Sequence, residues 1–220
     1  MSKVRANLKL LVIGSSGTGK TSFIQRWTKN EFLEDHRPSI VSEFAFKLFE
    51  YKEKQYRIQL WDIGGQDKSP SMMNIFAKDT YGCLVLTDCT DKSTLDDGLE
   101  WRNVMNEVSY FPDGKSIPFI LIHNKIDLIQ DKIELEEIKN NIKNFSENNN
   151  FTNYFMTSVK ENIKVDDAMK FLIENIIDRL EIYAGNGGEV FADQIKRETI
   201  RLRSEDFISV EEKKKNDCCK

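Results

Sequence analysis

Short apolar runs alternate along this chain with longer stretches in which apolar positions recur every three or four residues. The longer stretches predict helices, and residues 67–79 are expected to hold a further short one. Strands alternating with helices are typical of an α/β fold built on a mostly parallel sheet. The predicted strands are residues 8–13, 43–49, 55–61, 82–88, 117–123 and 154–156, and the predicted helices are residues 20–27, 95–110, 135–148 and 165–182.

The predicted strands differ in how they are covered. Residues 119–122 read Phe-Ile-Leu-Ile, and such a continuous apolar run is typical of a strand with both faces buried. Residues 43–49 and 55–61 are separated only by a short polar stretch, so they are expected to form a hairpin that makes one edge strand antiparallel. We therefore expect a doubly wound, six-stranded, mostly parallel sheet flanked by about five helices, with ligands bound at the carboxyl ends of its strands.

Composition narrows the class of protein. The 220 residues suit one domain over residues 1–184 and a flexible tail over residues 185–220. A net charge of -4 argues against a nucleic-acid-binding face, and no apolar run approaches the roughly 20 residues of a transmembrane helix. Cys83 and Cys89 lie in an apolar strand region and are expected in the core. The chain lacks a disulfide framework, which predicts a reducing, cytosolic compartment.

Residues 14–21, GSSGTGKT, match the phosphate-binding pattern G-x-x-x-x-G-K-[ST] between a predicted strand and a predicted helix. Glycines let successive N–H groups turn inward toward phosphate oxygens, and the helix adds free N–H donors and its dipole. The Lys20 ammonium is expected to reach the β- and γ-phosphates, and the Thr21 hydroxyl to bind Mg²⁺. The nucleotide ligands expected here are Ser16, Gly17, Thr18, Gly19, Lys20, Thr21 and Ser22.

A second group follows the strand that ends near Trp61, where the sequence reads WDIGGQ. Asp62 ends that strand and is expected to hold Mg²⁺ directly or through water. The Gly65 N–H is expected to meet a γ-phosphate. The Gln66 amide both donates and accepts, which suits the orientation of an attacking water, so Gln66 is the predicted catalytic residue.

Two further groups predict recognition of guanine. The Asp127 carboxylate, in the run Asn-Lys-Ile-Asp, can accept hydrogen bonds from the ring N–H and exocyclic amine of guanine, and adenine lacks these donors in that arrangement. The Lys125 stem is expected to cover the base. In the run Thr-Ser-Val-Lys, backbone N–H groups and the Ser158 hydroxyl are expected to meet the guanine carbonyl and brace Asp127. The predicted base-binding residues are Asn124, Lys125, Asp127, Ser158, Val159 and Lys160.

These four motifs, in this order over residues 8–182, resemble the small GTPases of the Ras superfamily. The WDIGGQ stretch, Ser16 and the terminal pair Cys218 and Cys219 resemble the Rab family within it. Residues 111–118, FPDGKSIP, resemble the Rab branch of lysosome-related organelles. The resemblance implies a P-loop NTPase fold, GTP or GDP and Mg²⁺ as ligands, slow GTP hydrolysis assisted by an activating protein, and control of vesicle traffic.

The resemblance also implies roles for individual residues. Phe32 would stack against the guanine edge, and Ser39 would ligate Mg²⁺ where the family has Thr. Phe44, Trp61 and Phe76 fall where Rabs place an aromatic triad that binds effectors, although ordinary core packing is the alternative for such rings. The sequence departs from the family at four switch positions, which affects partner choice: Val41, Ser42, Ser69 and Pro70.

The chain ends in Cys218-Cys219-Lys220, which is not a C-a-a-X sequence. It resembles the Rab double-cysteine ending and implies geranylgeranylation of Cys218 and Cys219, and two lipid chains hold a protein stably where one does not. The implied location is the cytoplasmic face of an endolysosomal or lysosome-related membrane, in exchange with the cytosol. The implied partners are an exchange factor, an activating protein, effectors, a prenylation escort and a GDP-dissociation inhibitor.

Two other functions stay open on the sequence. The altered switch residues are compatible with a scaffold that binds GTP and hydrolyses little of it. A P-loop nucleotide kinase is the other alternative, but it needs an arginine-bearing lid and an acceptor site, which we do not find in the sequence. Such a kinase also has no use for the Asn-Lys-Ile-Asp run at residues 124–127.

Overall fold

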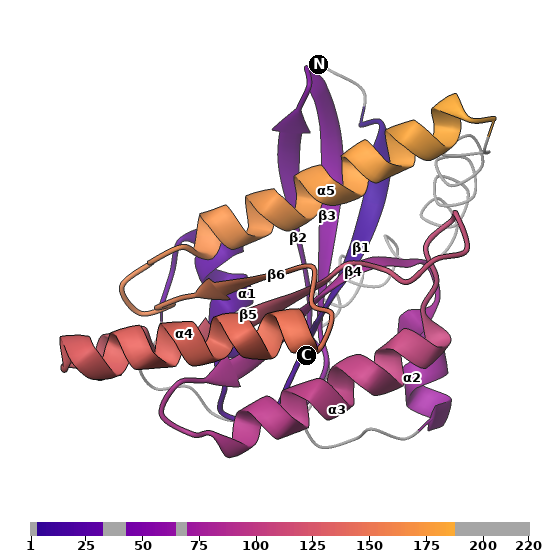
Figure 1. The fold of residues 1–220 in the computed structure, drawn as a ribbon. Coiled ribbons are helices and arrows are strands. Elements are labelled where there is room, and N and C mark those ends of the chain that lie inside the picture. Colours follow the sequence, from indigo (N-terminus) through magenta and orange to yellow (C-terminus); the bar gives the residue numbers. More distant parts are fainter. Residues whose placement is uncertain (1–3, 33–42, 65–69, 188–220) are drawn as a thin grey trace, which may run out of the picture.

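The computed structural model describes residues 4–32, 43–64 and 70–187. These residues form one six-stranded sheet in the order β2-β3-β1-β4-β5-β6, in which β2 runs antiparallel to β3 and the other neighbours are parallel (Figure 1). The predicted α/β fold with one antiparallel edge strand is confirmed. The strands are β1 (Ala6–Ile13), β2 (Glu43–Tyr51), β3 (Lys54–Asp62), β4 (Thr80–Asp88), β5 (Phe119–Asn124) and β6 (Asn153–Met156).

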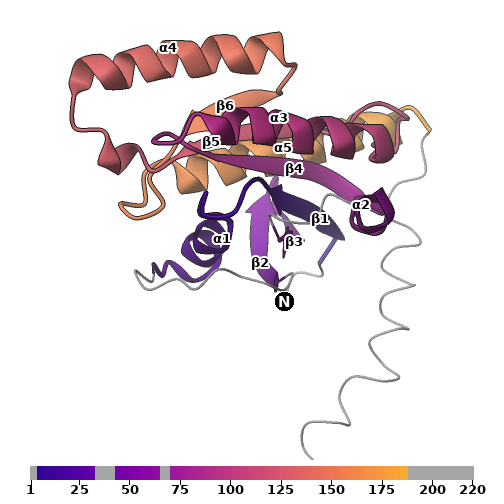
Figure 2. The same cartoon turned by 90° about the horizontal axis from the view of Figure 1, so that it is seen from below.

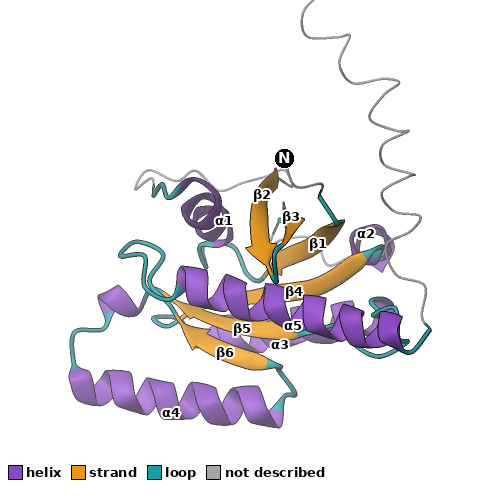
Figure 3. Cartoon of the chain, turned by 90° about the horizontal axis from the view of Figure 1, so that it is seen from above, coloured by secondary structure: helices purple, strands orange, loops and turns teal. Residues whose placement is uncertain are grey.

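Helices cover both faces of this sheet. In Figure 2, α1 and α5 lie on one side and α2 and α3 on the other, and α4 borders β6 at the edge. Figure 3 shows the strands running between these layers. The described α-helices are α1 (Lys20–Lys29), α2 (Pro70–Ala77), α3 (Ser93–Val108), α4 (Lys132–Asn148) and α5 (Val165–Gly185).

The central strand β4 is shielded from solvent, because each of its residues is buried. Two glycines let helices approach it closely. A Cβ at Gly82 would lie 2.8 Å from Ile176 of α5, and a Cβ at Gly98 of α3 would lie 2.9 Å from Thr87. Both faces of β4 are therefore pressed against helix, which fixes the carboxyl end of this strand relative to its neighbours.

The far end of the β2–β3 hairpin is tied to α5 by charge. Lys52 Nζ lies 2.8 Å from Asp178 Oδ1 and 3.0 Å from Glu181 Oε2, and Lys54 Nζ lies 2.8 Å from Glu181 Oε1. These contacts hold down the pKa of Glu181, mainly through its hydrogen bonds to Lys54 and Lys52. The hairpin is thus anchored at the end opposite to the predicted site.

Most element limits agree with the sequence prediction to within two residues. Helix α4 begins three residues before the predicted limit of residue 135, because the Asp131 side chain caps it by accepting the Ile133 N–H at 2.7 Å. A 3₁₀ turn, Ile126–Leu128, was not predicted. Helix α5 runs to Gly185, three residues past the predicted helix limit of residue 182. No described helix has both the length and the apolar character needed to cross a membrane.

Candidate functional site

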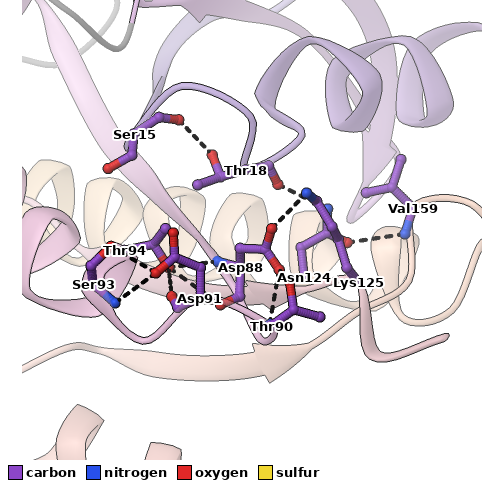
Figure 4. Close-up of polar contacts among 10 residues, drawn as sticks. All are labelled: Ser15, Thr18, Asp88, Thr90, Asp91, Ser93, Thr94, Asn124, Lys125 and Val159. Carbon is purple, nitrogen blue, oxygen red and sulfur yellow. Dashed lines mark hydrogen bonds and ion pairs between the residues drawn. The ribbon is translucent and has the colours of Figure 1, made fainter. Parts of the chain in front are cut away.

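The predicted motifs meet at the carboxyl edge of the sheet. The glycine loop follows β1, Asp62 ends β3, Asn124 ends β5, and the run that begins at Thr157 follows β6. Figure 4 shows the polar contacts where the loop, β4 and β5 come together. Because β1, β3, β4, β5 and β6 are parallel, their carboxyl ends bring together residues far apart in the sequence.

The glycine loop is shaped by two positions that accept no side chain. Gly14 has φ of 133°, and a Cβ there would lie 2.2 Å from the carbonyl oxygen of Leu86. Gly19 has φ of 96°, and a Cβ there would lie 2.6 Å from Nδ2 of Asn124. Positive φ and close neighbours together restrict both positions to glycine, so the loop curls tightly against β4 and β5.

The Lys20 side chain folds back and hydrogen-bonds to the glycine loop. Its Nζ donates to the carbonyl oxygens of Gly14 and Ser15, both at 2.9 Å, and the Thr18 hydroxyl also donates to Ser15 at 2.9 Å. Burial lowers the pKa of Lys20, and the carboxylate of Asp62 opposes that effect. A cation that is already largely desolvated interacts strongly with an incoming phosphate, because little further hydration is lost.

The expected magnesium ligands Thr21 and Asp62 lie in direct contact. The Thr21 hydroxyl hydrogen-bonds to Oδ2 of Asp62, a buried carboxylate at the end of β3. Within the described ranges, no three His, Cys, Asp or Glu residues cluster as a metal site. A hydroxyl and one carboxylate nevertheless suit Mg²⁺, which usually takes one or two protein carboxylates and completes its shell with phosphate oxygens and water.

The Asn124 side chain links the glycine loop to the loop that follows β6. Its Nδ2 donates to the Thr18 carbonyl at 3.0 Å, and its Oδ1 accepts from the Val159 N–H at 3.1 Å (Figure 4). The same Oδ1 also accepts from the Thr157 hydroxyl at 3.1 Å. The side chain is buried, so each of these partners would lose its hydrogen bond if Asn124 were truncated. One side-chain amide therefore fixes the glycine loop and the loop after β6 relative to each other.

The Asp127 carboxylate is held by its neighbour Ser158. The Ser158 hydroxyl donates to Asp127 Oδ1 at 2.5 Å, and the same hydroxyl oxygen accepts the Glu161 N–H at 3.0 Å. Ser158 is fully buried while Asp127 is partly exposed, so the serine fixes a carboxylate that still faces outward. This is the brace that the sequence predicted between these two residues.

The Lys125 side chain is fixed by a residue that the sequence analysis missed. Its Nζ lies 2.5 Å from Oδ2 of Asp88, whose Oδ1 accepts the N–H and hydroxyl of Thr90 at 2.9 and 2.7 Å (Figure 4). Burial tends to raise the pKa of Asp88, but Lys125 and Thr90 outweigh it and the net pKa is lowered. The position of Asp88 at the end of β4, beside β5, was the available signal.

Two of the three predicted triad rings contact each other directly. Phe44 and Trp61 lie edge to face with centroids 5.4 Å apart, and Lys9 Nζ lies 5.0 Å from the Trp61 centroid. The same Nζ donates to the Phe76 carbonyl at 2.8 Å, which brings α2 to this cluster. Phe44 is 50% exposed, so it forms part of a surface and is not a core residue.

The remaining predicted residues divide into two groups. Ser16 and Gly17 are exposed at the loop tip, Ser22 is buried in the first turn of α1, Phe32 is partly buried beyond α1, and Lys160 is exposed. Several predictions fall outside the described residues and stay predictions: Ser39, Val41, Ser42, Gly65, Gln66, Ser69, Cys218 and Cys219.

Comparison with known proteins decides the family. The Ras family model matches residues 9–178, the region that carries every described part of the site. The chain belongs to the Ras family of small GTPases. It is similar to Ras-related protein Rab-32 of Mus musculus, with 34% identity over 86% of this chain and 82% of that protein. It is also similar to Ras-related protein Rab-7L1 of Homo sapiens, with 32% identity over 77% of this chain and 82% of that protein.

A third relative, Ras-related protein Rab-32A of Dictyostelium discoideum, is 36% identical over 77% of each chain. The predicted resemblance to Rabs is thereby confirmed, and this Rab is a GTP hydrolase. As a Rab it is a small GTPase switch in membrane traffic that binds guanine nucleotide, associates with intracellular membranes, and works with exchange factors, activating proteins, effectors and a GDP-dissociation inhibitor. The nucleotide-kinase alternative is set aside by this membership.

Proposed function

We propose that this Rab binds GTP and GDP with Mg²⁺ at the carboxyl edge of its sheet, with the phosphates on the glycine loop and guanine against Asp127. The observation that supports this most is the hydrogen-bonded path from Thr18 through Asn124 to Val159. This path connects the loop proposed to hold the phosphates with the loop proposed to hold the base. The proposed nucleotide ligands are Ser16, Gly17, Thr18, Gly19, Lys20, Thr21, Ser22, Phe32, Ser39, Gly65, Asn124, Lys125, Asp127, Ser158, Val159 and Lys160.

Mg²⁺ would be held by Thr21, Ser39 and Asp62, and when bound it neutralises charge on the phosphates. In hydrolysis, the oxygen of a water molecule oriented by Gln66 forms a bond to the γ-phosphorus while the bond to the β-phosphate oxygen breaks. The products are GDP and inorganic phosphate. Lys20 and the loop N–H groups stabilise the charge that develops.

Nucleotide competition tests the site. The full chain is loaded with a fluorescent GDP analogue, and excess GTP is expected to displace it while excess ATP does not. Equal displacement by both would refute guanine selection. Asp127→Ala should abolish tight binding, and Asp131→Ala serves as its control, because Asp131 caps α4 without belonging to the proposed site.

Single-turnover hydrolysis tests the proposed chemistry. Gln66→Leu should slow the conversion of bound GTP, since leucine cannot orient water. An unchanged rate would remove Gln66 from the mechanism. The intrinsic rate of the wild type, measured with and without cell extract, also decides the scaffold alternative: turnover near zero under both conditions would favour a protein that only holds GTP.

Effectors are proposed to dock on the surface formed by Phe44, Trp61 and Phe76 when GTP is bound; Phe44 is half-exposed there, and the other two rings are partly buried. The half-exposed Phe44 ring, in contact with Trp61, supports this surface. Proteins captured on Gln66→Leu loaded with GTP are compared with those captured by the GDP form, and Phe44→Ala should lose the GTP-specific set. If Phe44→Ala still captures that set of proteins, effectors do not dock on this surface.

Membrane attachment is proposed to use geranylgeranyl groups on Cys218 and Cys219, at an endolysosomal or lysosome-related membrane. Two chains give stable anchoring. Replacement of both cysteines by serine should move the protein from the membrane to the cytosolic fraction, while Cys83→Ser, a buried site, controls for substitution of a cysteine. Unchanged membrane association of the double variant would refute the anchor.

A further inference from the structure

Arg26, in the last turn of α1, connects three backbone carbonyl groups. Its Nε donates to the Val159 carbonyl and its Nη2 to the Lys160 carbonyl, both at 2.9 Å, and its Nη1 donates to the Asn30 carbonyl at 3.1 Å. A guanidinium group presents its donors in a rigid planar fork, so one side chain can hold several acceptors in fixed relative positions.

Only one of these three acceptors belongs to the end of α1. A residue that simply capped its own helix would bond the last carbonyls of that helix. Arg26 instead sends two of its donors to Val159 and Lys160, more than 130 positions away in the sequence, as the separations of 133 and 134 show. Its main connection is therefore between α1 and the loop that follows β6.

That loop is the one that carries the proposed guanine contacts. The Val159 N–H is bound to Asn124, and the Ser158 hydroxyl is bound to Asp127. Arg26 holds the opposite, carbonyl side of the same loop. Two independent sets of hydrogen bonds thus act on residues 158–160 from either side.

Arg26 also lies beside Phe32. Its guanidinium carbon is 5.8 Å from the Phe32 ring centroid, within the range of a cation–π contact. The Asn30 carbonyl accepts from Arg26, and the Asn30 N–H donates to the Arg26 carbonyl at 2.9 Å. Asn30 adopts a left-handed conformation with φ of 59°. The chain turns there and reaches Phe32 two residues later.

We propose that Arg26 is a positioning residue that sets the residence time of guanine nucleotide, by fixing the loop of residues 158–160 and Phe32 to the same group. The inference rests on the guanine site proposed above. A base held between Phe32 and this loop leaves only when one of them moves, and either movement disturbs the contacts of Arg26. Loss of the guanidinium should therefore speed release of the nucleotide while leaving the hydrogen bonds of Lys20 to the glycine loop in place.

The test is the rate at which a fluorescent GDP analogue leaves the full chain into excess GDP with Mg²⁺ present. Arg26→Ala should raise this rate at least about tenfold, because it removes the hydrogen bonds to Val159 and Lys160 and the loss of one charge-assisted hydrogen bond already corresponds to about this factor. Arg26→Lys should give an intermediate rate, because an ammonium group cannot span the same carbonyls. If Arg26→Ala releases the analogue within about twofold of the wild-type rate, the range of a neutral surface change, the proposal is overturned.

Arg102→Ala is the matched control. Arg102 makes the same kinds of contact elsewhere, with Nη2 3.3 Å from the Asn150 carbonyl oxygen and its guanidinium 5.5 Å from the Phe119 ring. Its truncation tests the general cost of losing a half-buried arginine. Release from Arg102→Ala should stay within about twofold of the wild type. An acceleration equal to that of Arg26→Ala would show that the effect is only one of lost stability, and would overturn the proposal.

A double-mutant cycle supplies a readout that loss of stability alone does not change. Phe32→Ala should speed release less in the Arg26→Ala background than in the wild type, since the ring has already lost its neighbour. If the accelerations of release caused by the two substitutions simply multiply, Arg26 and Phe32 are not coupled and the proposal is overturned. If Arg26→Ala does not fold, as judged by circular dichroism, the same cycle is run with Arg26→Lys. If ADP displaces the analogue from the wild type as readily as GDP does, the proposed guanine site itself is refuted, an outcome that this control distinguishes from a failure of the role of Arg26.

Discussion

The ion pair between Asp88 and Lys125 leads to a prediction that can be worked out from the structure. Asp88→Asn removes the negative charge and keeps the shape of the side chain. The amide oxygen of asparagine can still accept the N–H and hydroxyl of Thr90, which now bond to Oδ1. The substitution therefore isolates the interaction with Lys125, whose Nζ lies 2.5 Å from Oδ2.

The expected magnitude follows from burial. The side chain of Asp88 is 11% exposed and that of Lys125 is 33% exposed, so the pair is neither fully solvated nor fully buried. Exposed pairs contribute about 0.2–1 kcal/mol and buried pairs cost several kcal/mol when one partner is removed, so we expect a coupling of about 1–2 kcal/mol. If Lys125 covers the base only when it is held in place, release of GDP should become about tenfold faster, which corresponds to 1.4 kcal/mol.

Two measurements check this prediction. Urea unfolding at saturating GDP and Mg²⁺, for the wild type, Asp88→Asn, Lys125→Ala and the double variant, gives the coupling, and dissociation of a fluorescent GDP analogue gives the rate. Asp91→Asn is the control, because Asp91 lies in the same loop and bonds Ser93 without contacting Lys125. A coupling below about 0.3 kcal/mol, the usual error of additivity, would refute the reasoning.

The pH dependence of this pair has a definite sign. The pKa of Asp88 lies below its ordinary value of 3.8 in the folded chain, against the effect of burial, because Lys125 and Thr90 favour the ionised form. Its contribution to stability is therefore complete above that ordinary value and is lost as the pH falls through the lower, folded pKa. The coupling measured between pH 5 and pH 8 should be constant, and a coupling that disappears near pH 6 would contradict the assignment to Asp88.

Three further predictions concern other residues of the sheet edge. Asp127→Asn should weaken GDP binding about a thousandfold and favour a xanthine nucleotide, whose ring carbonyl can accept from the new amide; competition with both nucleotides measures this. Gly14→Ala should destabilise the fold by about 3 kcal/mol or more in thermal unfolding, because its Cβ would overlap the Leu86 carbonyl at a positive φ. Burial lowers the pKa of His123 from 6.5 to about 4, so stability should fall by about 3 kcal/mol between pH 6.5 and pH 4. His123→Gln, which keeps a hydrogen bond for Thr87, should lack this loss in unfolding measured across that pH range.

The sequence predicted the fold well because the strands are local signals: β4 and β5 are continuous apolar runs, and β2 and β3 are closely spaced segments typical of a hairpin. It also predicted the brace of Asp127 by Ser158, since both residues lie in recognisable motifs. It missed the partner of Lys125, because Asp88 lies in no motif and becomes its neighbour only through the parallel pairing of β4 and β5. Arg26 was missed for a different reason: its acceptors are backbone carbonyls, which every residue has and which leave no sequence signal.

The close contact between Gly19 and Asn124 constrains how this chain can change over generations. A side chain at position 19 would occupy the space of the Asn124 amide, and it would also have to adopt a φ of 96°, which residues other than glycine rarely do. A smaller residue at position 124 would make room, but it would also give up the hydrogen bonds to Thr18, Thr157 and Val159. Changes of base preference, by selection or by engineering, are therefore expected at positions whose side chains do not contact the glycine loop, among them Lys125 and Asp127.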